Sequence, residues 1–207
     1  MAVIKGGILG KASGKISGVV AATWKNKNYV RTLVTPANPR TVNQVAARNQ
    51  FKAVAVFGEG IVGNILNPYM SPFLRNMSGY NWFVKTNRPS FGTSPSYGTV
   101  ITTHGQLFAA SVSSATCVAG LVTLSTSTAL GSNGLATDLL YCCIYNEAYH
   151  NWWFAAAEVA RSTGTITIQT GGAGGNTMDY YLTTVRRDAA SRVTMVSNSV
   201  SSTVVYA

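Results

Sequence analysis

Acidic residues are scarce in the first 92 residues of this 207-residue chain, which contain only Glu59. Twelve lysines and arginines face that single acid, so this part carries a net charge of +11. Residues 93–207 hold four arginines against five acids and are close to neutral at −1. The imbalance predicts that the two parts face different partners. A basic half attracts nucleic acid, an anionic membrane or an acidic protein surface.

Cysteines are few, and none forms a CxxC pair. An odd count of three, Cys117, Cys142 and Cys143, indicates neither a disulfide framework nor a zinc site. Adjacent residues of a strand point to opposite faces, so we expect Cys142 and Cys143 to be buried, reduced thiols on the two sides of a sheet.

Long apolar runs are also missing, since no uninterrupted run approaches the roughly 18 residues of a membrane span. Glycine and lysine interrupt residues 1–15, which do not form a signal-peptide pattern. We therefore expect no membrane span and synthesis in a cytoplasm.

Motifs for catalysis or cofactor binding are absent as well. The only histidines, His104 and His150, lie in no metal or catalytic-triad pattern, and no carboxylate pair is close in sequence. The glycine-rich run at 171–176 lacks the Lys-Ser/Thr that follows a phosphate loop, so we interpret it as a hairpin turn. The sequence thus predicts no enzyme, no cofactor and no metal.

What is present predicts a folded chain, because 46% of its residues are hydrophobic and only 11% are charged. We divide it into an extended basic arm and hairpin at 1–40, a helix with an aromatic and proline-rich connection at 41–98, and a β-sandwich at 99–207. The arm is too polar and glycine-rich to fold alone, so it needs another surface. Its β-forming residues flank the turn-like Lys25-Asn26-Lys27-Asn28, which predicts a hairpin.

A capping-box pattern from Thr41 to Gln44 predicts the start of a helix at about 41–57 that falters at Gly58, Gly60 and Gly63. Arg48 and Lys52, at i and i+4, share one face of this helix. We expect a short second helix near 78–86, and aromatic residues of the connection that pack the helix onto the sheet.

Strand patterns fill the remainder of the chain. We expect strands at 99–112, 116–124, 138–146, 151–160, 164–170, 178–186, 192–198 and 202–206. About seven short strands at this spacing favour a mainly β fold with an immunoglobulin-like β-sandwich, and a jelly roll is the alternative.

Two parts of the sequence resemble an uncharacterised family abundant in Bacteroidetes and their phages. The family pattern "GKxxGxVV…WK…YVR" matches the arm from Gly14 to Arg31, and "NPxTxxQxxxRxxF" matches the segment from Asn38 to Phe51. Its closing strands are similar around Asp138-Leu139-Leu140, Arg161-Ser162 and Val196-Ser197-Asn198-Ser199. The resemblance implies no enzyme activity. The "NPxTxxQxxxRxxF" segment is also similar to segments of phage virion proteins, which implies a viral structural role.

Together these features predict a structural, non-enzymatic virion component of a bacteriophage, such as a minor capsid, penton or decoration protein. It would be made in the host cytoplasm, would form a homo-oligomer and would contact other virion proteins. A cytoplasmic protein that binds nucleic acid without sequence specificity and a bacterial surface-associated, adhesin-like module are the alternatives. We expect electrostatic contacts to the partner from Lys5, Lys11, Lys15, Lys25, Lys27, Arg31, Arg48 and Lys52.

Overall fold

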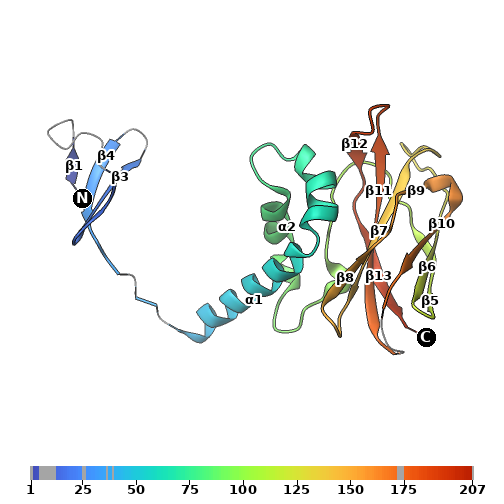
Figure 1. Cartoon of the computed structure of the whole chain (residues 1–207), viewed down its shortest axis with the longest axis horizontal. Coiled ribbons are helices and arrows are strands. Elements are labelled where there is room, and N and C mark those ends of the chain that lie inside the picture. The colour runs from blue at the N-terminus through green and yellow to red at the C-terminus, as the bar shows by residue number, and fades with distance from the viewer. Residues whose placement is uncertain are drawn as a thin grey trace. The chain divides into compact units, whose positions relative to one another are not determined.

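The computed structural model describes residues 2–4, 13–24, 27–35, 37–38, 40–171 and 175–206. It divides into two compact units, Met1–Thr41 and Val42–Ala207. The protein is mainly β, with three antiparallel sheets (Figure 1).

The first unit contains one four-stranded sheet with the order β1-β4-β3-β2. Its strands are β1 (Ala2–Ile4), β2 (Gly14–Ile16), β3 (Val19–Trp24) and β4 (Lys27–Thr32). The pairing of β3 with β4, from Val19 opposite Thr32 to Trp24 opposite Lys27, confirms the predicted hairpin. None of the side chains described in this unit is buried.

Helices open the second unit. They are α1 (Val42–Glu59), the π-helix η1 (Val62–Met70), the 3₁₀ turn η2 (Ser71–Phe73), α2 (Gly79–Asn87) and the 3₁₀ turns η3 (Arg88–Ser90) and η4 (Tyr97–Thr99). The start of α1 and the existence of α2 confirm the prediction. The predicted end of the helix near Gly58 and Gly60 is also confirmed, because α1 ends at Glu59 and the chain turns at Gly60–Ile61. The predicted interruption at Gly63 was wrong, because Gly63 lies within η1. Gly58 lets α2 approach closely, since a Cβ atom there would lie 2.9 Å from the Phe83 ring.

Two sheets face each other in the remainder of the second unit. The three-stranded sheet, in the order β10-β6-β5, contains β5 (Val112–Val118), β6 (Leu121–Thr126) and β10 (Thr165–Gln169). The six-stranded sheet contains β12 (Val193–Val196), β11 (Thr177–Arg187), β7 (Leu139–Asn146) and β8 (Asn151–Phe154) in that order, with β13 (Val200–Val205) on β11 and β9 (Val159–Ala160) on β7.

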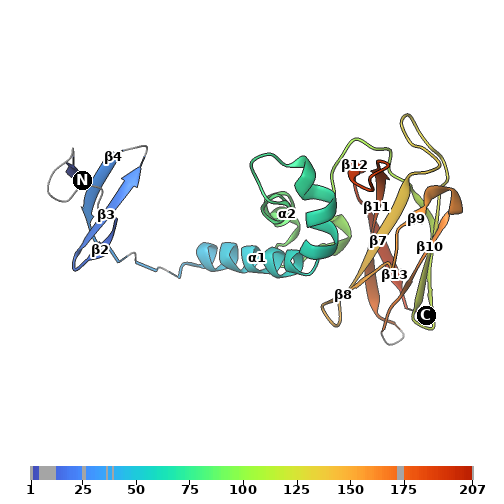
Figure 2. The ribbon, with the colours of Figure 1, turned by 45° about the horizontal axis from the view of Figure 1, so that its top comes forward.

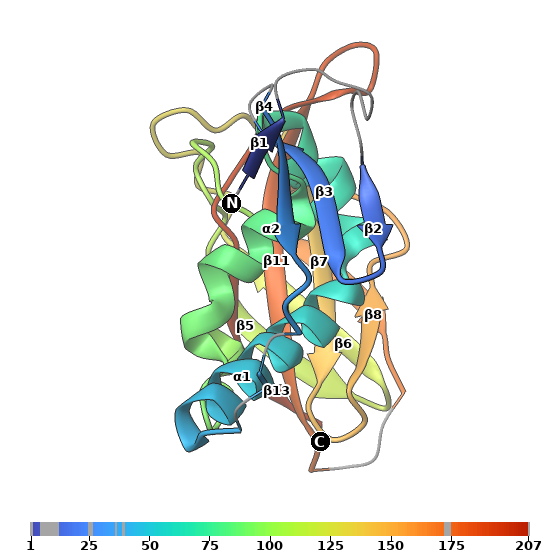
Figure 3. The same cartoon turned by 90° about the vertical axis from the view of Figure 1, so that its left-hand side faces the viewer.

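The six-stranded sheet lies between the helices and the three-stranded sheet (Figures 1 and 3). Strand β7 shows why both faces are apolar: Cys143 and Tyr145 join the core beneath the helices, whereas Leu140, Cys142 and Ile144 join the core between the sheets. The expectation of two buried, unpaired thiols on opposite faces is therefore confirmed. Aromatic side chains such as Phe83 and Phe91 pack the helices onto the sheet, as expected.

The strand predicted at 99–112 was wrong for most of its length. Side chains satisfy this backbone in place of a strand ladder: Asn87 bonds both the N–H and the C=O of Ile101, and the Ser199 hydroxyl accepts from the N–H of Thr102. The single strand at 116–124 was also wrong, because Ala119 and Gly120 adopt positive φ and form a turn between β5 and β6. Strands β10 and β11 lie in different sheets, so the hairpin predicted at 171–176 is wrong too; residues 172–174 lie outside the described part.

Candidate functional site: an aromatic pocket beside α1

The N-terminal half of α1 extends beyond the rest of its unit (Figure 2). Every residue from Val42 to Asn49 is exposed, and burial begins only at Val54 and Phe57. Apolar side chains are among those left in solvent: Val42 is 84% exposed, Phe51 54% and Val56 59%. Short isolated helices are marginal in water, so this half depends on the packed half or on a partner.

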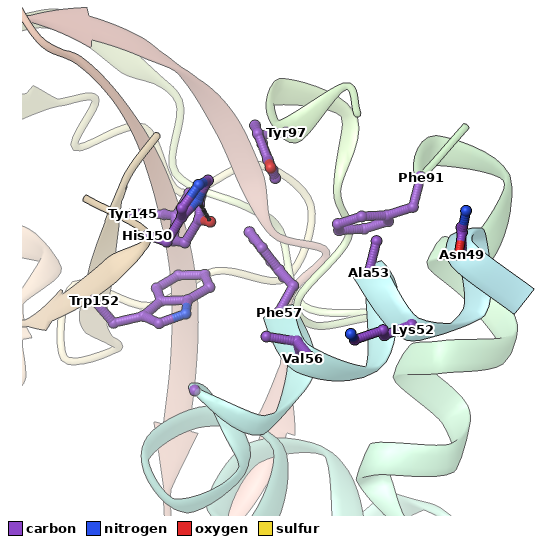
Figure 4. Close-up of a pocket in the computed structure, with 11 residues that line it drawn as sticks. Asn49, Lys52, Ala53, Val56, Phe57, Phe91, Tyr97, Tyr145, His150 and Trp152 are labelled. Carbon is purple, nitrogen blue, oxygen red and sulfur yellow. Dashed lines mark hydrogen bonds between the residues drawn. The ribbon is translucent and has the colours of Figure 1, made fainter. Parts of the chain in front are cut away.

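A pocket of about 550 Å³ lies where the packed half of α1 meets the edge of the six-stranded sheet. Helix α1 contributes Asn49, Lys52, Ala53, Val56 and Phe57, and Gly60 follows it. The segment after α2 contributes Phe91 and Tyr97, and strands β7 and β8 with their turn contribute Tyr145, His150 and Trp152 (Figure 4).

Phe57 is the centre of the ring cluster. Its ring centroid lies 4.7 Å from those of both Tyr145 and Trp152, in edge-to-face geometry, and 5.2 Å from that of Phe91. Such contacts fix each ring more firmly than apolar burial alone. The pocket floor is therefore a surface of closely packed aromatic rings.

Local backbone features hold the polar residues of the pocket in place. The side chain of buried Asn146 accepts hydrogen bonds from the N–H groups of Ala148 and Tyr149, which shapes the β7–β8 turn. His150 then takes a positive φ of 53°, and its Nδ1 is 2.8 Å from the Tyr145 hydroxyl. Burial raises the pKa of Tyr145, and the neighbouring Tyr97 raises it further, so this hydroxyl stays neutral.

Two ion pairs elsewhere in the unit have a structural role. Glu158 accepts hydrogen bonds from Tyr69 of η1 and from Arg187 of β11, and so ties the helices to the sheet. Arg186 pairs with fully buried Asp138 at 2.7 Å. Both acids thus serve the interior of the fold rather than an open site.

Buried Arg161 also has a structural role, because it bonds segments that are distant in sequence. Its guanidinium donates to the carbonyls of Phe108 and Ala129 and lies over the Phe108 ring.

Among the residues that the structure describes, no group of three or more histidines, cysteines and acids could hold a metal ion. No helix within the described ranges is both long and apolar enough to cross a membrane.

The predicted contact residues fall into three groups. Lys5, Lys11 and Lys25 lie outside the described residues, as does the side chain of Lys27. Lys15 and Arg31 are exposed, and both lie in register with Val20, which places them on one face of the first sheet. Arg48 and Lys52 are exposed on α1, and Lys52 is the one that lines the pocket among the four whose side chains the structure describes.

Sequence reasoning missed the aromatic part of this site. Tyr97, Tyr145 and Trp152 come from three separate segments, and only the fold brings them to α1. One signal was available at Gly60: a Cβ atom there would lie 2.3 Å from Cδ1 of Trp152, so this glycine makes room for the indole.

Comparisons with known proteins place the chain in a family but identify no function. No curated protein and no solved structure matches it significantly. A model described as "Family of unknown function (DUF6266)" matches residues 11–201. Because this match covers most of the sequence, the chain belongs to the DUF6266 family.

Proposed function

We propose that the chain is a structural, non-enzymatic component of a phage virion, such as a minor capsid, penton or decoration protein. It docks on other virion proteins through its basic N-terminal unit and the exposed half of α1. After synthesis in the host cytoplasm it is incorporated into the particle as an oligomer.

The observation that carries the proposal is the surface that the monomer leaves uncovered. The first half of α1 exposes Val42, Val45 and Phe51, and an open groove of about 710 Å³ lies between its Asn43–Gln50 face and residues 92–95. The sheet of the first unit adds exposed Val19 and the edge strands β1 and β2. Exposed apolar surface and open sheet edges mark sites of protein contact.

Charge supports the same docking surface. The first 92 residues carry +11, whereas the sandwich is nearly neutral. A partner with an acidic surface would be attracted to this part of the chain and not to the sandwich, which would orient the encounter.

Strand order supports an immunoglobulin-like form of the sandwich. One sheet follows the order β5-β6-β10, and in the other the paired edges β12/β13 and β8/β9 flank β11 and β7. Consecutive strands cross between the sheets at β6–β7, β9–β10 and β10–β11. This Greek-key pattern is typical of immunoglobulin-like folds, which serve as scaffolds for many unrelated functions.

The test is mass spectrometry of gradient-purified particles from phages that encode the chain. We expect it in intact particles at a fixed copy number relative to the major capsid protein. Its absence from infectious particles, together with its presence in the soluble lysate, would overturn the proposal.

Nucleic-acid binding is the second candidate, because Lys15 and Arg31 share one sheet face with the ring of Tyr29. About six phosphate contacts would give a slope near −5 for log affinity against log salt. Binding of a 30-base-pair duplex or a dT15 strand by the full chain at about 0.15 M salt would favour this function. No binding there, with incorporation into particles intact, would exclude it.

A further inference from the structure

The aromatic pocket has the properties of a preformed binding site. Its volume of about 550 Å³ lies within the range of roughly 300–1,000 Å³ that ligand sites occupy. Phe57, Phe91 and Tyr145 are almost fully buried at its floor, while Trp152 and Tyr97 are only partly covered and form its walls. A ligand would contact ring faces that are already in position before it binds.

Charge at the rim is positive. Lys52 is the only lysine, arginine or acidic residue that lines the pocket, and exposed His150 and Asn49 are the other polar residues at its edge. Residues 42–58 contain no acid, so Glu59 is the only acid in the sequence of α1. Glu59 raises the pKa of Tyr80, which does not line the pocket, whereas Glu147 contributes to the raised pKa of Tyr145, which does.

The floor selects against polar ligands. A nucleobase would bring several hydrogen-bonding groups onto ring faces, and burial of unpaired polar groups costs roughly 1–3 kcal/mol each. The Tyr145 hydroxyl is already bonded to His150, and the carbonyl of Tyr97 already accepts from Tyr181. A hydrocarbon or aromatic side chain carries no such penalty and would gain ring contacts.

We propose that this pocket binds one large apolar side chain, preferentially aromatic, that projects from an acidic segment of the protein partner. The side chain packs between Trp152 and Tyr97, and flanking carboxylates pair with Lys52. An aromatic anchor in a desolvated pocket with complementary charge at the rim is the usual form of an interface hot spot. The inference rests on the proposed function, because it specifies what the docking partner carries.

The test uses the full chain and a fluorescein-labelled peptide, Ser-Asp-Glu-Asp-Trp-Glu-Asp-Glu-Ser, in fluorescence anisotropy. We expect saturable binding that falls at least tenfold when the peptide Trp is replaced by Ala, and at least tenfold when its acids are replaced by Lys. If the protein is labelled with 5-fluorotryptophan, the ¹⁹F signal of Trp152, assigned with the Trp152→Phe variant, should shift on binding.

Matched variants distinguish binding in the pocket from general electrostatic attraction to the protein. Val56→Trp fills the pocket from an exposed position and should abolish binding, whereas Val118→Trp, at an exposed position of β5 that does not line the pocket, should leave binding within twofold. Lys52→Glu should weaken binding at least fivefold, and the exposed charge control Lys85→Glu should not.

Three results would overturn the inference: no binding up to about 1 mM peptide, equal binding of the Trp and Ala peptides, or displacement of the peptide by dT15 with a matching shift of the Trp152 signal. None of these results bears on whether the chain is present in particles, so they test the pocket separately from the proposed function.

Discussion

Asp179 lies near the start of β11 without exposed surface, and neither of its carboxyl oxygens has a hydrogen-bond donor among the described residues. Burial and, to a lesser extent, the neighbouring Glu147 carboxyl together raise the pKa of Asp179 to about 7. Both observations are explained if one carboxyl of the Asp179–Glu147 pair is protonated and donates a hydrogen bond to the other. The folded chain therefore holds a proton that the unfolded chain releases near pH 4.

Asp179→Asn should stabilise the chain above neutral pH. Because the folded-state pKa is raised, the wild type loses stability as pH rises from about 4 to 7, by up to about 1.4 kcal/mol for each pH unit in that window. The neutral amide avoids this loss and can still donate to Glu147. Urea unfolding should show a gain of a few kcal/mol at pH 8 and little difference at pH 4. Equal effects at both pH values would contradict the shared proton.

Gly60→Ala should disturb the pocket wall. The added Cβ would lie 2.3 Å from Cδ1 of Trp152, whose ring is held by Phe57 and Tyr145, so we expect a loss of about 1–3 kcal/mol and a change in tryptophan fluorescence. Gly63→Ala is the matched control, since a Cβ atom there meets nothing within 4 Å. Equal behaviour of the two variants would mean that Gly60 does not position the indole.

At the scale of elements, the Glu158 carboxylate joins η1 to β11. Burial alone would raise the pKa of Glu158, but hydrogen bonds from Arg187 and Tyr69 lower it below its usual value. The stabilisation is therefore present above the unfolded pKa of about 4.3 and is lost as pH falls through the lower folded value.

Glu158→Gln should destabilise the chain by about 1–3 kcal/mol at pH 7, because Arg187 loses its charged partner in a half-buried site. Near pH 3 the difference from the wild type should shrink. Arg192→Gln removes an exposed pair with Asp188 and should cost under about 0.5 kcal/mol, as surface pairs do. A pH-independent difference for Glu158→Gln would contradict the ion pair.

Helix α1 should show two levels of protection. Hydrogen exchange of the isolated chain should be fast for the amides of residues 46–50 and slow for residues 54–58, because only the second group packs on the sheet. In assembled particles the first group should become protected. Equal protection of both groups in a chain shown to be monomeric by sedimentation would remove the need for a partner there.

The elements that sequence patterns predicted well are those whose periodicity matches their burial. The alternation in β7 and the apolar residues Val54 and Phe57 of the predicted helix correspond directly to the two cores. Residues 100–111 resemble a strand in composition, but their hydrogen bonds go to distant side chains such as Asn87 and Ser199, which no local pattern encodes. The same holds for the pocket, whose lining residues come from three separate segments.

At the scale of the whole molecule, we propose that docking depends on the charge and uncovered apolar surface of residues 1–92 rather than on the sandwich. Most buried polar groups of the sandwich have hydrogen-bond partners within it, and the sandwich is nearly neutral. Residues 1–92, in contrast, carry a net charge of +11, and apolar side chains of α1 are exposed. The sequence was sufficient to predict the charged half. It could not show which cations lie together, because Lys15 and Arg31 meet on one face only through the pairing of β2, β3 and β4.

Incorporation into particles tests the central claim most directly. Phage stocks would carry either the triple variant Lys15→Glu, Arg31→Glu, Lys52→Glu or the control Arg75→Glu, Lys85→Glu, Arg192→Glu, which reverses three exposed charges elsewhere. Copies per gradient-purified particle would be counted by quantitative mass spectrometry. We predict at least a tenfold loss for the first variant and a change within twofold for the control, with both proteins folded by circular dichroism. Equal copy numbers for the two variants would contradict docking through these residues.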